Sequence, residues 1–188
     1  MEIRSVESFL AYYRRIRQRT MRVVRAIPPE RIEWTYREGK WTLGDLVRHL
    51  GALERQMFAE NVRGGPSTYG GCGRELADGY EAVVAFLEAR HGETLEILAS
   101  LSDADLMGKC TTPGGAEITV WKWLRAMVEH EIHHRGQIYL YLSMLGVPTP
   151  PLYGLTAEEV EERSATPQCR ARARRTTSWR YLRIRRSR

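Results

Sequence analysis

The feature that most constrains the fold is a long amphipathic stretch at residues 119–145, which predicts a single helix of about 27 residues, or ~40 Å. Thr119 is expected to cap its start, and Gly146 followed by Pro148 is expected to end it. Apolar residues recur at spacings of three and four, so one face should be buried. These residues are Val120, Trp123, Leu124, Met127, Ile138, Tyr141, Leu142 and Leu145.

The same helix carries three of the five histidines in the chain, His130, His133 and His134. His130 and His134 continue the apolar stripe, whereas His133 lies beside it. Residues four apart on a helix have Cβ atoms roughly 5–6 Å apart, so two such imidazoles can hold one metal ion. An ordinary polar pair is the simpler interpretation, but an unpaired imidazole is costly to bury.

Three further amphipathic helices are predicted, at residues 5–26, 42–62 and 79–99. The arginines of the first, Arg14, Arg15, Arg17 and Arg19, are expected to be mostly solvated, and His91 on the third is expected at the surface. The residues predicted to face inward are, for the three helices in that order, Phe9, Tyr12, Tyr13, Ile16, Val23 and Val24; Leu43, Leu46, Val47, Leu50, Leu53, Met57 and Phe58; and Tyr80, Val83, Val84, Leu87, Leu95 and Leu98. Four such helices and no convincing sheet predict an all-α four-helix bundle.

Long connections separate these helices, at residues 27–41, 63–78 and 100–118. Each can span the length of a helix at ~3.3 Å per residue, so up-down and crossover topologies both remain open. The glycine-rich connection at 63–78 is expected to be a mobile loop, and it lacks the GK[ST] ending of a phosphate loop. Residues 112–119 could form a short hairpin.

His49 lies on the helix predicted at 42–62, three residues after Leu46 and four before Leu53, and so shares its buried face. Alone, it would be interpreted as a hydrogen-bonded core histidine. The matching pair at His130 and His134 makes it a ligand candidate, and the three together predict one metal site. Three histidine ligands leave a coordination position open, which is typical of catalytic rather than structural zinc.

Imidazole ligands suit Zn and Ni, and also Fe and Cu. Glu131, Glu129 and Glu54 are candidate acceptors for the second N–H of a ligand by proximity, although each is first interpreted as a solvated charge. Such a metal could deprotonate a low-molecular-weight thiol, or it could activate water for hydrolysis. No general base is assigned. Four further residues could line the pocket, though bundle packing explains them equally well: Arg135, Gln137, Tyr139 and Tyr141.

The net charge of +6 comes from residues 163–188, which contain ten arginines and no acidic residue. The remaining 19 basic and 23 acidic residues give −4, so nucleic-acid binding by the folded domain at residues 1–162 is not expected. The tail at 163–188 is interpreted as a disordered appendage, although its WRYLRIRR segment could bind nucleic acid or an acidic surface. Before it, Thr156 and Glu159 form a predicted capping box for a short helix.

No apolar run is long enough to span a membrane, and the N-terminus has no apolar signal core. The three cysteines, Cys72, Cys110 and Cys169, are scattered without a CxxC motif. Together these features fit a cytoplasmic protein in a reducing compartment.

Two motifs carry a family resemblance: WTLGDLVRHLGALER around His49, and HEIHHRGQIYLYLSMLGVPTP from His130, followed by YGLTAEEV. They resemble the DinB/YfiT-like superfamily over roughly residues 1–162. The resemblance implies a four-helix bundle with a crossover connection and a divalent metal ion held between helices. His49, His130 and His134 match the family's ligands, and His133 matches none.

Related branches of that superfamily include thiol-dependent S-transferases and isomerases that use bacillithiol, mycothiol or glutathione. The resemblance therefore implies a metal-dependent, thiol-dependent S-transferase acting on a small-molecule substrate. A metal-dependent hydrolase is one alternative. A non-catalytic metal-binding or regulatory domain, with a homodimer as a candidate assembly, is another.

Overall fold

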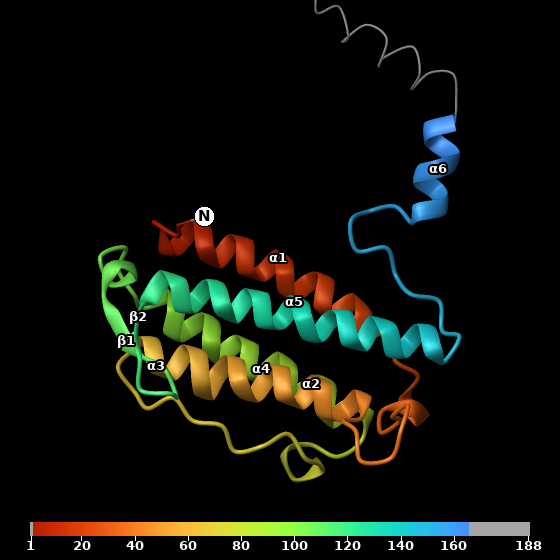
Figure 1. Cartoon of the computed structure of the whole chain (residues 1–188), viewed down its shortest axis with the longest axis horizontal. Coiled ribbons are helices and arrows are strands. Elements are labelled where there is room, and N and C mark those ends of the chain that lie inside the picture. Colours follow the sequence, from red (N-terminus) through yellow and green to blue (C-terminus); the bar gives the residue numbers. More distant parts are fainter. Residues whose placement is uncertain (1, 166–188) are drawn as a thin grey trace, which may run out of the picture. The chain divides into compact units, whose positions relative to one another are not determined.

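The computed structural model describes residues 2–165. The chain divides into two units between Pro150 and Pro151, and each is described by itself. The first unit is a bundle of four helical rods connected by loops (Figure 1). The rods are α1 (Val6–Val24), α2 (Leu43–Ala52) continued by η2 (Leu53–Ala59) and α3 (Glu60–Val62), α4 (Tyr80–Ala99), and α5 (Val120–Met144). The predicted four-helix bundle is confirmed.

Shorter elements occupy the connections. They are the 3-10 turns η1 (Pro29–Arg31), η3 (Arg74–Leu76) and η4 (Asp105–Met107), and the strands β1 (Lys109–Thr111) and β2 (Glu117–Thr119). The two strands pair antiparallel as a small hairpin directly before α5. The rod expected at 42–62 is present, but η2 is π-helical, which shifts the phase of the side chains beyond Leu53 relative to α2.

The second unit contains α6 (Ala157–Ala165). Its predicted capping box is present: Glu159 N donates to Thr156 Oγ1 at 3.2 Å, and Thr156 N donates to Glu159 Oε2 at 2.8 Å. The predictions for the arginine-rich tail fall, from residue 166 onward, outside the described residues. Within residues 2–165, none of the helices combines the length and apolar character needed to cross a membrane.

The helices are arranged with a crossover. α1 packs against α4 and α5, and α2 packs against the same two helices from the other side. α1 and α5 run in one direction, and α2 and α4 run in the other (Figure 1). Because α2 and α4 are parallel neighbours, residues 63–79 must return along the length of the bundle. The crossover connection implied by the family resemblance is therefore present.

Local capping explains where the rods begin and end. At α2, Asp45 N donates to Thr42 Oγ1 at 3.0 Å and Thr42 N donates to Asp45 Oδ2 at 2.9 Å, so the two residues form a capping box. At the end of α5, Gly146 has a φ of 70° and Val147 N donates to Leu142 O at 2.9 Å. This Schellman ending needs a residue that tolerates the left-handed region, which is why glycine stands there.

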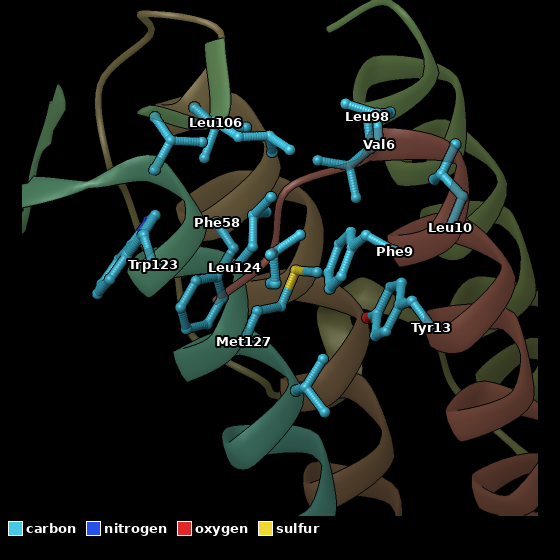
Figure 2. Packing of buried hydrophobic residues seen from close by; sticks show 14 of the residues in the cluster. Val6, Phe9, Leu10, Tyr13, Phe58, Leu98, Leu106, Trp123, Leu124 and Met127 are labelled. Atoms are coloured by element: carbon cyan, nitrogen blue, oxygen red, sulfur yellow. The ribbon is translucent and has the colours of Figure 1, made fainter. Parts of the chain in front are cut away.

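The main apolar core lies between α1, η2 and the first half of α5. Phe9 and Tyr13 stack with ring centroids 5.8 Å apart, and Phe58 lies 4.6 Å from the ring of Trp123 (Figure 2). Each fully buried large apolar side chain of this kind contributes about 1.5–3 kcal/mol. Tyr12 was expected on the inward face but is 40% exposed, because the buried face of α1 contains the adjacent Tyr13 instead.

Arg17 is buried, which contradicts its expected place on the solvated face of α1. Its side chain is 5% exposed, and its guanidinium forms ion pairs with both Glu54 and Glu131. Thr20 Oγ1 also donates to Glu131 Oε1 at 2.6 Å. Although burial alone would lower the pKa of Arg17, the two carboxylates raise it above its usual value, so the guanidinium stays charged.

His91 joins the same network and is mostly covered, which corrects its expected surface position. Its Nδ1 lies 2.6 Å from Glu54 Oε1, and its ring packs edge-on against Tyr13 at 5.3 Å. We call Arg17, Glu54, Glu131 and His91 the buried ion network. It connects α1 to η2, α4 and α5, so charge pairing as well as apolar packing sets the position of the rods.

We predict that Arg17→Met destabilises the fold by about 3–5 kcal/mol, because it leaves two buried carboxylates without their counter-charge. The free energy of unfolding in urea measures this. Arg15→Met, which removes an exposed arginine from the same helix, should change it by less than about 0.5 kcal/mol. Equal midpoints for the two variants would contradict the structural role given to Arg17.

Candidate metal centre

Three histidines from two helices converge inside the bundle. His49 lies in the last turn of α2, and His130 and His134 lie one turn apart on α5. One ring nitrogen from each of the three lies within 4.8 Å of the others, and the Nε2 atoms of His49 and His130 are 3.0 Å apart. The ring centroids of His130 and His134 are 4.4 Å apart. The structure thus brings together the three residues that the sequence singled out.

In two of these rings, the Nδ1 atom is hydrogen-bonded to an uncharged group. His49 Nδ1 lies 2.8 Å from the hydroxyl of Tyr69, and His134 Nδ1 lies 2.6 Å from Gln137 Oε1. The amide oxygen can only accept, so His134 carries its proton on Nδ1 and presents an unprotonated Nε2. A tyrosine oxygen can receive the Nδ1 proton of His49 in the same way. This arrangement is typical of metal-ligating histidines.

The cluster favours neutral imidazoles. Burial, followed by the proximity of His134, lowers the pKa of His49 to about 4. Burial, again with the neighbouring histidines, lowers the pKa of His130 to about 3. The pKa of His134 is also lowered, by burial first. At neutral pH all three rings are therefore uncharged and have a lone pair available for a metal ion.

The glycine-rich connection after α3 lies next to the histidine cluster because a residue of α2 holds this connection in place. Arg48 is fully buried, and it donates to the carbonyl oxygens of Cys72 at 2.7 Å and Ala77 at 3.0 Å. Ion pairs with Glu33 and Asp45 hold the guanidinium in place. Arg48 thereby anchors the loop that carries Tyr69 directly beside His49.

An aromatic side chain also packs against the cluster. The ring centroid of Trp41 lies 4.5 Å from that of His49 and 5.9 Å from that of His134. Tyr141 OH donates to the carbonyl oxygen of Trp41 at 3.3 Å, which ties this part of the connection to α5. Trp41 therefore contacts two of the three rings.

The glutamates expected beside the ligands lie elsewhere. Glu131 and Glu54 are 2% and 3% exposed and belong to the buried ion network, so they are neither solvated nor paired with the cluster. Glu129 is solvated, as expected, and pairs with Arg125 at 3.2 Å. His133 is exposed and lies outside the converging group, although its ring is 4.9 Å from that of His134.

From the sequence, Gln137 is only a candidate pocket residue, and nothing there points to Tyr69. Gln137 lies three residues after His134, a spacing that places both on one helix face and could have revealed the contact. Tyr69 lies in an irregular loop without periodicity, so its sequence carries no comparable signal. Of the remaining pocket candidates, Arg135 is buried against α1, where its Nη1 lies 3.4 Å from Ile16 O.

Comparisons with solved structures agree on the fold. A DinB-like protein from Bacillus cereus ATCC 10987 is 19% identical, with a TM-score of 0.67 over 80% of this chain and 99% of its own. A DinB-like protein from Bacillus subtilis is also 19% identical, with a TM-score of 0.64 over 79% and 99% of the two chains. A mycothiol-dependent maleylpyruvate isomerase is 17% identical, with a TM-score of 0.53 over 71% and 60%.

A search of the curated proteins finds no match. The model of the DinB superfamily, however, matches residues 12–138, a span that includes His49, His130 and His134. Together with the crossover bundle and the three converging histidines, this match shows that the chain belongs to the DinB superfamily.

Proposed function

We propose that His49, His130 and His134 bind one divalent metal ion through their Nε2 atoms, and that the protein is a metal-dependent enzyme. The observation that carries this proposal is the convergence of three neutral imidazoles. In two of them, His49 and His134, Nδ1 lies within hydrogen-bond distance of an acceptor oxygen. Zn and Ni fit this donor set best, and Fe or Cu would also suit it. Three protein ligands leave room for a water molecule or a substrate atom.

The reaction we propose is the transfer of a low-molecular-weight thiol to a small electrophilic substrate. When bound, the metal supplies the positive charge that favours a thiolate over a thiol. Around it, Tyr69 and Gln137 hold the Nδ1 protons of two ligands and orient their rings, and Trp41 packs against the same two rings. No general base is part of the proposal.

One observation supports the choice of a thiol over water as the activated group. The mycothiol-dependent maleylpyruvate isomerase shares this fold, so a bundle of this kind is compatible with thiol chemistry. The thiol, the substrate and the cytoplasmic location are all parts of the proposal.

We predict that the purified protein holds about one divalent ion per chain and that His49→Ala and His130→Ala each lose it. Elemental analysis after dialysis measures the metal content. His133→Ala is the matched control, because it removes a neighbouring exposed imidazole and should retain the ion. Stoichiometric metal in both His49→Ala and His130→Ala would show that the ion is bound elsewhere.

We predict that Gln137→Leu weakens metal affinity by about 10–100-fold, because His134 loses the acceptor for its Nδ1 proton. Gln137→Glu keeps an acceptor oxygen and should restore most of the affinity. Tyr69→Phe should weaken affinity in the same direction, whereas Tyr139→Phe, on α5 outside these contacts, should not. Competition with a coloured chelator gives the affinities, and unchanged values for Gln137→Leu would contradict the assigned role.

We predict that metal-loaded protein, given the electrophile 1-chloro-2,4-dinitrobenzene, turns over only when bacillithiol, mycothiol or glutathione is added. The release of chloride and the absorbance of the thioether product report the reaction. Removal of the metal or His130→Ala should abolish the enzymatic rate, with His133→Ala as the active control. Hydrolysis without any thiol would indicate a hydrolase, and silence with every thiol would indicate a non-catalytic binding domain.

A further inference from the structure

A cavity adjoins the histidine cluster on the side of α5 that follows His134. Its volume is about 610 Å³, within the range of small-molecule sites. Along α5 it is lined by Gln137, Leu140 and Met144, which continue towards the end of the helix. The connection before α2 supplies the facing wall. We call this cavity the α5 pocket.

Two residues belong to both the α5 pocket and the surroundings of the histidines. Trp41 lines the pocket and packs against His49 at 4.5 Å and His134 at 5.9 Å. Gln137 lines it as well, and its oxygen is hydrogen-bonded to His134. A molecule in the pocket therefore touches the same side chains that touch the proposed ligands.

The lining of the α5 pocket is apolar and aromatic, yet much of it is open to solvent. Tyr36 is 48% exposed, Trp41 41%, Leu140 59% and Met144 55%. Scattered apolar residues at a surface need no explanation, but here four of them surround one cavity. Such a wall favours an occupant with a flat apolar body, because aromatic rings and a methionine thioether pack well against one another.

The charge of the pocket adds a second requirement. Among the described residues that line it, Lys40 is the charged one, and no carboxylate joins it there. The ammonium group of Lys40 is suited to pair with an anionic group on a ligand whose other atoms are buried in the apolar cavity. Gln137 offers its NH₂ group as a further donor, since its oxygen already accepts from His134.

We propose that the α5 pocket binds the electrophilic substrate, and that this substrate is an aromatic or similarly flat apolar molecule bearing one carboxylate. Lys40 pairs with the carboxylate, and the rings of Tyr36 and Trp41 with Leu140 and Met144 enclose the apolar body. The role of the α5 pocket as a substrate pocket rests on the proposed metal-dependent function. The binding of an organic anion in the pocket does not depend on that function, because none of the proposed metal ligands lines the cavity.

The test uses 2-naphthoate as the anionic probe and 2-naphthamide as its neutral counterpart, with affinities measured by isothermal titration calorimetry on the full chain. The wild-type protein should bind 2-naphthoate at least fivefold more tightly than 2-naphthamide. Lys40→Met should remove that preference. Leu140→Asp should weaken 2-naphthoate binding at least tenfold, whereas Met107→Asp, at a 56% exposed methionine that does not line the pocket, should leave it unchanged.

His130→Ala separates this inference from the proposed function. The variant should keep its affinity for 2-naphthoate within about twofold, even if it loses the metal and all turnover. Loss of binding in His130→Ala would show that the metal site takes the carboxylate, and would overturn the proposal. So would undetectable binding by the wild type, or equal binding by Leu140→Asp.

The same variants also test whether the exposed apolar wall is covered by a second copy of the chain. Light scattering after size exclusion should give one oligomeric state for the wild type and Leu140→Asp. If the wild type is a dimer that Leu140→Asp dissociates, the wall is a self-association surface rather than a substrate pocket, and the proposal fails.

Discussion

The guanidinium of Arg17 connects the two helical rods that carry the histidines. It reaches from α1 to Glu54, which follows His49 in the same rod, and to Glu131, which follows His130 on α5. A buried charge of this kind stabilises the fold only while both partners stay within reach, and leaving one unpaired costs several kcal/mol. The spacing between α2 and α5, and so the separation of the three imidazoles, depends on this pairing.

The same pairing affects the chemistry of the histidine cluster. Because Glu54 and Glu131 are used by Arg17, the hydrogen-bond partners left for the histidines are the neutral groups of Tyr69 and Gln137. Under the proposed function, a divalent ion held by three neutral imidazoles with neutral supporting groups keeps its full positive charge. That charge would favour an anionic thiolate, and the proposed anion-binding role of Lys40 would then help to orient the substrate.

Periodicity was sufficient to predict the four rods and the convergence of His49 with His130 and His134. Each of these depends on residues within a few turns of one another, or on buried faces that must meet in a bundle. The partners of Arg17 could not be predicted in this way, since they are 37 and 114 positions away along the chain and its own spacing resembles that of its solvated neighbours. Tyr69 was missed because a loop side chain is positioned by tertiary contacts, here those of Arg48.

The parallel arrangement of α2 and α4 has a consequence for the surroundings of His49. A tight turn cannot join parallel neighbouring helices, so the polypeptide must travel back along the bundle, and this return segment contains Tyr69, which contacts His49. The topology of the bundle thus places Tyr69 beside His49. Insertions or deletions in this connection would change the surroundings of His49 while leaving the helices that carry the three histidines unaltered.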